Sequence, residues 1–95
     1  MSSRPIYLDN AATTAVDPRV IAAISSCLGA DGDFANPSSV NHVYGREASA
    51  RVEHARAEVA ALVNAAPEQI LFTSGATEAN NLALLGAARF HRNRS

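Results

Sequence analysis

The pattern of apolar and polar positions predicts three helices. Apolar side chains recur every three or four residues over 17–29, from about 39 to 64, and again over 77–89. Asp17 and Pro18 suit a helix start, because Asp accepts hydrogen bonds from the first turn and Pro fits its first position. The third stretch is apolar on nearly all sides. We therefore expect other segments to cover that helix on more than one face.

The segments between these helices predict loops and short strands. Residues 5–8 (PIYL) are typical of a short strand or an extended arm, and residues 9–14 form a small polar loop. Residues 30–39 are rich in turn formers, and residues 69–73 (QILFT) predict a strand. One strand followed by a buried helix is half of a βαβ unit. The expected fold class is α/β, as the first part of a larger protein: an incomplete domain, mostly helical, with one or two short strands.

Composition limits what the chain can bury and bind. Of its 95 residues 47% are hydrophobic, but 20 are Ala and none is Trp, so the core is thin. The net charge is -1 and the basic residues are scattered, which argues against nucleic acid or an anionic membrane as a partner. No apolar run approaches the roughly 20 residues of a membrane span, and the N-terminus lacks the apolar part of a secretory signal. We expect a cytoplasmic protein.

The stretch TSGATE, between the predicted strand and the third predicted helix, is a candidate anion-binding site. A helix N-terminus presents unpaired N–H groups and a positive dipole end, and both favour an anion. Gly75 and Ala76 leave room for a ligand, and the hydroxyls of Ser74 and Thr77 can donate to phosphate oxygens. The alternative is an ordinary helix cap. Neither a P-loop nor a dinucleotide fingerprint is present.

Three stretches occur in an order that resembles a known family: YLDNAATT (7–14), NPSSVNHVYG (36–45) and ILFTSGATEANNLAL (70–84). Together they are similar to the N-terminal part of a cysteine desulfurase, over about residues 5–90. Cysteine desulfurases are class V aminotransferases, which use pyridoxal 5'-phosphate (PLP) on the fold-type I scaffold. The resemblance implies conversion of L-cysteine to L-alanine, with persulfide sulfur delivered for iron–sulfur clusters and tRNA thiolation. It also implies a homodimer partner and a sulfur-acceptor or scaffold protein.

The resemblance assigns roles to individual residues. Ala76 and Thr77 match the pair that holds the PLP phosphate, with Ser74 and Gly75 beside them. The matching positions for the substrate side of the pocket are Asn10, Ala11 and Ala12. Residues 1–14 correspond to an N-terminal arm on the small-domain side, and residues 15–95 to the start of a truncated PLP-binding large domain.

What the chain lacks is equally informative. All eight residues of the Lys+Arg count are Arg, whereas the family attaches its cofactor to a lysine. The family's lysine, ring-contacting Asp and His, mobile-loop Cys and substrate-binding Arg all lie beyond the matched region. We therefore expect no catalytic residue here and no activity from the chain alone. A selenocysteine lyase, an aminotransferase, or an inactive piece with only a binding or structural role remain alternatives.

Two further sets of residues invite a functional reading. Cys27 could be taken for the sulfur acceptor, but it lies on the apolar side of the first predicted helix, so burial is the expected role. Asp31, Asp33 and Asn36 could supply oxygen ligands, yet they lack the ordered spacing of a calcium loop. We predict no metal site.

Overall fold

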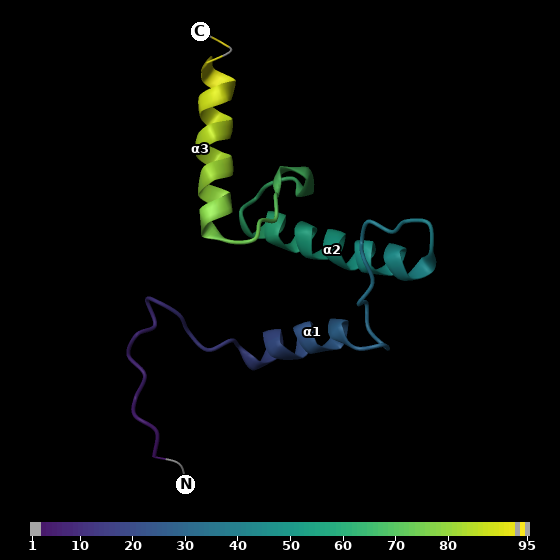
Figure 1. Ribbon diagram of the computed structural model, residues 1–95, viewed down its shortest axis with the longest axis vertical. Coiled ribbons are helices and arrows are strands. Elements are labelled where there is room, and N and C mark those ends of the chain that lie inside the picture. The colour runs from purple at the N-terminus through teal and green to yellow at the C-terminus, as the bar shows by residue number, and fades with distance from the viewer. Residues whose placement is uncertain (1–2, 93, 95) are drawn as a thin grey trace. The chain divides into compact units, whose positions relative to one another are not determined.

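A computed structural model describes residues 3–92 and 94 (Figure 1). The elements in order are α1 (Pro18–Leu28), α2 (Val43–Leu62), the short 3-10 helix η1 (Pro67–Gln69) and α3 (Ala76–Arg92). The chain divides into two compact units, Met1–Val52 and Glu53–Ser95, so α2 gives its first half to one unit and its second half to the other. No helix in the described part is long and apolar enough to cross a bilayer.

The start of α1 follows the prediction. The Asp17 carboxylate accepts the N–H of Arg19 at 2.8 Å, and Pro18 occupies the first turn. The same carboxylate pairs with the Arg19 guanidinium at 2.8 Å. The side-chain hydrogen bond from Arg19, and then its backbone N–H, lower the pKa of Asp17 below its ordinary value. A capping carboxylate held in its charged form also favours the helix dipole.

Within the first unit, Arg51 joins three segments. Its Nε lies 3.0 Å from Cys27 Sγ and its Nη2 donates to Ser26 Oγ at 2.6 Å, both at the end of α1. The Nε also lies 3.4 Å from a carboxylate oxygen of Asp33. Cys27 is only half-buried, so the expectation that it is buried holds only in part. Its thiol accepts a hydrogen bond from a guanidinium that a carboxylate already engages.

The start of α2 lies four residues later than predicted, at Val43 instead of Ser39. The Asn36 side chain accepts the N–H of Ser38 at 2.9 Å, and its carbonyl accepts the N–H of Ser39 at 3.0 Å. This Asx turn offers the backbone an alternative to the helix. Gly45, in the first turn of α2, is buried because the Ser39 backbone lies against it.

The end of α2 confirms the predicted stop at Asn64. Asn64 has a positive φ of 55°, and its N–H donates to Ala61 O at 3.3 Å. The N–H of Ala65 donates to Ala60 O at 2.9 Å. These two bonds and the left-handed residue make a Schellman motif. Ala60, 1% exposed, is one of the two buried apolar residues in the described part, with Ala48.

The predicted strand over 69–73 is wrong for the described residues. Gln69 closes η1, and Ile70 is extended, with φ -99° and ψ 126°, but no strand forms in the part of the chain that the structure covers. The expectation of one or two short strands fails for the same reason. A strand exists only when its backbone pairs with a neighbour. Residues 5–8 likewise form no strand, which leaves the arm interpretation.

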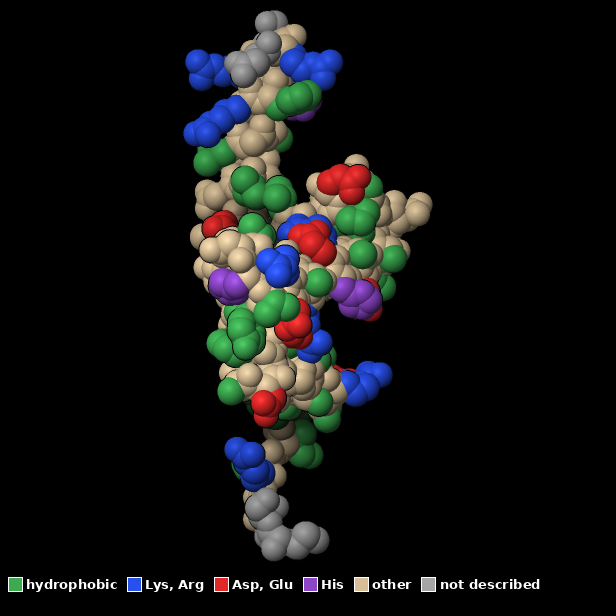
Figure 2. All heavy atoms as spheres, turned by 90° about the vertical axis from the view of Figure 1, so that its right-hand side faces the viewer, with side chains coloured by type: hydrophobic (Ala, Val, Ile, Leu, Met, Phe, Trp, Pro, Cys, Tyr) green, Lys and Arg blue, Asp and Glu red, His purple; other side chains and the backbone are tan. Residues whose placement is uncertain are grey.

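The third helix begins at Ala76 and ends at Arg92, close to its predicted bounds, but none of its residues is buried. Leu82 is 49% exposed and Leu85 is 52% exposed. The expectation that other segments cover this helix is therefore not met within the described residues. Arg side chains gather around its C-terminal end (Figure 2), where the last turn is basic. Cations there interact favourably with the helix dipole.

Candidate functional site

The predicted phosphate seat lies where α3 begins. The carbonyl of Gly75 accepts the N–H of Ala79 at 3.1 Å, so the helical hydrogen bonds start there. The Thr73 hydroxyl donates to the same carbonyl at 3.1 Å. A turn over 73–75 therefore leads directly into the first turn of a 17-residue helix.

The donors of this seat are available to a ligand. N–H groups in a first helical turn, such as those of Ala76 and Thr77, have no partner within the helix. The side chains of Ser74 and Thr77 make no hydrogen bond to any other described residue, and residues 74–77 are all exposed. A Cβ added to Gly75 would meet nothing within 4 Å. The donor set and the open space fit a phosphate group.

One carboxylate already lies beside the seat. Glu78, in the first turn of α3, accepts the N–H of Ser74 at 2.8 Å. The contact closes the turn and places a negative charge at the positive end of the helix dipole. The contact gives Glu78 a role in stabilising the start of α3. It also means that an incoming anion meets one N–H group that is already bonded, and a like charge.

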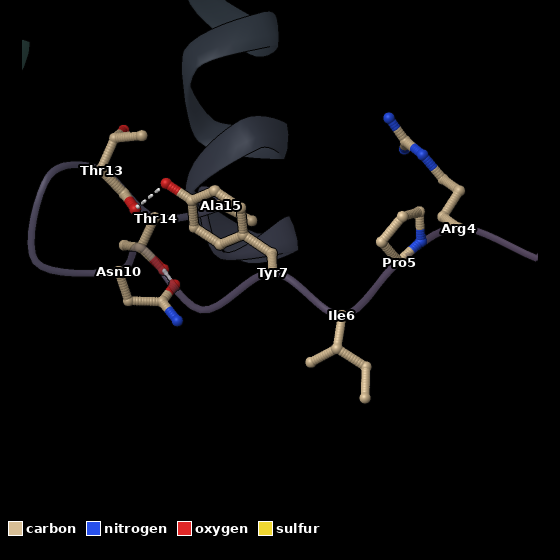
Figure 3. A pocket seen from close by; sticks show the side chains of 8 residues that line it. All are labelled: Arg4, Pro5, Ile6, Tyr7, Asn10, Thr13, Thr14 and Ala15. Atoms are coloured by element: carbon tan, nitrogen blue, oxygen red, sulfur yellow. Dashed lines mark hydrogen bonds between the residues drawn. The ribbon is translucent and has the colours of Figure 1, made fainter.

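The predicted substrate-side loop has its own internal order. The hydroxyl of Tyr7 lies 2.9 Å from both Asp9 O and Thr13 O, and the N–H of Ala12 donates to Asp9 O at 3.1 Å. The Thr14 hydroxyl donates to the side-chain oxygen of Asn10 at 3.0 Å. Figure 3 shows the Tyr7 ring reaching across toward Thr13. The tyrosine therefore ties both ends of the loop together.

An open depression of about 710 Å³ lies along this segment (Figure 3). Its lining residues are Arg4, Pro5, Ile6, Tyr7, Asn10, Thr13, Thr14 and Ala15. Asn10, one of the three predicted substrate-side positions, borders this depression. Ala11 and Ala12 are not among its lining residues.

The two predicted sets belong to different units of the chain: the substrate-side loop to the first and the phosphate seat to the second. Each set has the local geometry described above. Among residues 3–92 and 94, no group of three or more His, Cys, Asp or Glu side chains is arranged to hold a metal ion.

Sequence reasoning missed two residues that organise these loops. One is Tyr7, whose hydroxyl closes the substrate-side loop. The other is Arg56, whose guanidinium contacts the segment before the phosphate seat and whose side chain is only 23% exposed. The helical spacing indicates only that Arg56 lies on the inward stripe of α2, four residues from both Val52 and Ala60; it does not identify the partner of Arg56.

Comparison with known proteins decides the family. A family model described as aminotransferase class-V matches residues 6–95, nearly the whole chain. This chain belongs to the class V aminotransferase family. Class V aminotransferases depend on PLP, and membership implies the fold-type I scaffold. The resemblance drawn from the three sequence stretches is therefore confirmed.

Several relatives of this chain are named as cysteine desulfurases. The chain is 59% identical over 87 residues to the cysteine desulfurase IscS of Pseudomonas fluorescens (strain SBW25). It is 58% identical to proteins of the same name from Ectopseudomonas mendocina (strain ymp) and Pseudomonas aeruginosa (strain LESB58). Each match covers 92% of this chain but 22% of the relative. The chain therefore spans about a fifth of the length of the curated relatives it matches.

Proposed function

We propose that this chain supplies the cofactor-phosphate seat and the substrate-side loop of a PLP-dependent cysteine desulfurase. The observation that carries the proposal is the exposed, hydroxyl-flanked N-terminus of α3 at Ser74–Thr77, in a chain 59% identical to a desulfurase. In the overall reaction L-cysteine becomes L-alanine, and its sulfur passes to an acceptor thiol, which becomes a persulfide. Bound PLP supplies the electron sink that allows the carbon–sulfur bond to break.

The chain's own residues bind and orient. The N–H groups of Ala76 and Thr77, with the hydroxyls of Thr77 and Ser74, hold the cofactor phosphate, and Gly75 lets the backbone come close to it. Asn10 borders the substrate, and Ala11 and Ala12 keep that side of the site small. A fixed phosphate fixes the position of the reacting ring, and such positioning accounts for much of an enzyme's effect.

We further propose that residues 1–14 form the arm on the small-domain side and residues 15–95 the start of the PLP-binding domain of an α/β fold. The desulfurase would act in the cytoplasm as a homodimer and pass sulfur to an acceptor or scaffold protein. The chain alone would be inactive, because all eight of its Lys and Arg residues are Arg, and none can attach the cofactor covalently.

A chimera tests the activity. The matched segment of the Pseudomonas fluorescens desulfurase is replaced by this chain, and alanine and sulfide are measured with L-cysteine and a thiol reductant. The proposal expects turnover at a rate close to that of the parent. A chimera that takes up PLP but forms no alanine would refute it. Faster turnover of L-selenocysteine, or transamination without sulfide, would favour the other class V reactions.

A second experiment tests the inactivity of the chain itself. The chain, with its N-terminal amine acetylated, is incubated with PLP and then treated with borohydride. We expect no covalent gain in mass, since no lysine amine is available. A stable adduct would overturn this part of the proposal. Adding a polypeptide that carries the rest of the desulfurase, and assaying sulfide, separates an inactive chain from one that acts by complementation.

A further inference from the structure

In the second unit one side chain links α2 to the segment that leads into the phosphate seat. Arg56 Nη1 donates to Ile70 O at 2.6 Å, and the Arg56 guanidinium carbon lies 5.0 Å from the centre of the Phe72 ring. Its Nε lies 3.2 Å from Glu53, one turn earlier on the same helix. One guanidinium therefore engages a carboxylate, a backbone carbonyl and an aromatic face.

The chemistry of this contact is specific to arginine. A guanidinium is planar and rigid, so its N–H groups can serve two acceptors in its plane while its face lies on a ring. Glu53 neutralises the charge and holds the plane in one orientation. The side chain is 23% exposed, whereas Glu53 is 60% exposed, so water competes less for the Arg56 donors than for its partner. Charge-assisted hydrogen bonds of this kind are stronger than neutral ones.

The contact acts on a short piece of chain. Ile70 also donates its own N–H to Pro67 O at 3.1 Å, so both polar groups of its backbone are engaged. Between Phe72 and the first residue of α3 lie only Thr73, Ser74 and Gly75. Fixing Ile70 and Phe72 therefore restricts where the helix N-terminus can lie relative to α2. The four steps from the Cα of Phe72 to the Cα of Ala76 span at most roughly 14 Å.

We propose that Arg56 is a positioning residue for the phosphate seat, acting through Ile70 and Phe72 without touching the ligand. This inference rests on the proposed function of residues 74–77. Apparent affinity falls in proportion to the population of the binding-competent state. If loss of Arg56 lowers the competent fraction of the loop from about nine-tenths to about one-tenth, phosphate binding weakens by about tenfold.

The test uses the whole 95-residue chain with inorganic phosphate as the probe. Amide chemical shifts of residues 73–79 are followed by NMR during the titration, and ¹⁵N relaxation of residues 70–77 is measured without ligand. Arg56→Met keeps the aliphatic stem and the helix propensity but removes the donors. The matched control is Arg51→Met, the same change on the same helix at a residue whose contacts lie in the first unit.

We expect Arg56→Met to loosen residues 70–77 and weaken phosphate binding about tenfold, with the far-ultraviolet helix signal unchanged. Arg56→Lys, which keeps the charge and one donor, should give intermediate affinity, and Arg51→Met should leave both readouts at wild-type values. Equal relaxation and affinity in the two Met variants would overturn the inference. If wild-type amides at 74–77 ignore phosphate, the proposed seat fails instead, and the ligand-free relaxation still decides whether Arg56 orders the loop.

Discussion

The close contact between Gly45 and Ser39 predicts that Gly45→Ala lowers stability, whereas helix propensity alone would predict that the same substitution raises it. Gly45 lies in the first turn of α2, where Ala is intrinsically favoured over Gly by up to about 1 kcal/mol. A Cβ at position 45 would lie 2.6 Å from the carbonyl carbon of Ser39 and 2.9 Å from its Cβ, with the carbonyl oxygen closer still. Backbone atoms must therefore move, and forced overpacking costs about 1–3 kcal/mol.

The expected result of Gly45→Ala is a net destabilisation of up to about 2 kcal/mol, which is the cost of overpacking less the gain in propensity. The matched control is Gly86→Ala in α3, where a Cβ would meet nothing within 4 Å and the propensity gain of about 1 kcal/mol should appear in full. Helix population at each site is measured from ¹³Cα shifts, and stability from urea titration followed by circular dichroism. A rise in α2 population with Gly45→Ala, equal to the rise in α3 with Gly86→Ala, would refute the reasoning.

Three other substitutions test separate contacts. Asn64→Gly should extend the helical signal at the end of α2, and Asn64→Val should shorten it, because a β-branched residue tolerates a φ of 55° poorly; ¹³Cα shifts of residues 58–64 report both. Arg19 lowers the pKa of Asp17, so the charged cap contributes its full stabilisation of α1 at pH values above the ordinary Asp pKa of 3.8. This stabilisation is lost as the pH falls through the lowered pKa of the folded state. An acid titration that follows the chemical shifts of α1 should show this loss, and Asp17→Asn should abolish the pH dependence. Glu78→Gln should strengthen phosphate binding by about two- to fivefold in the amide titration, because it removes a like charge while an oxygen still reaches Ser74 N–H; weaker binding would mean that the charge of the cap matters more than repulsion.

The helices could be predicted from local patterns, since the signals for their ends are local. Asp17 before Pro18 marks the start of α1, and Asn64 marks the end of α2; both act on backbone groups within a few residues. The predicted start of α2 at Ser39 is too early, because the Asx turn at Asn36 competes with helical hydrogen bonds there. Residues 69–73 failed as a strand because pairing is a property of two segments, and the described residues supply no second one.

In the candidate site, too, features set by neighbouring residues could be predicted, whereas features that depend on a distant partner could not. The donors at Ser74–Thr77 could be predicted, because a helix start and its flanking hydroxyls are written in neighbouring positions. Arg56 could not be assigned, since its partner carbonyl at Ile70 is fourteen residues away and no local rule selects it. The bond from Tyr7 to Thr13 spans six residues of irregular chain, for which no periodicity exists.

Because α3 is exposed, burial of its apolar side chains and anion binding at its first turn would be coupled, although the two sites are not in contact. An isolated helix of 17 residues is marginal in water, and helix–coil relaxation takes about a microsecond or less. The dipole and the aligned N–H groups at its first turn exist only while the helix is formed. Any surface that packs on Leu82 and Leu85 raises the helical population. By linkage it would also tighten anion binding at the proposed phosphate seat without contacting it. Phosphate bound at the proposed seat would, in turn, favour burial of those leucines.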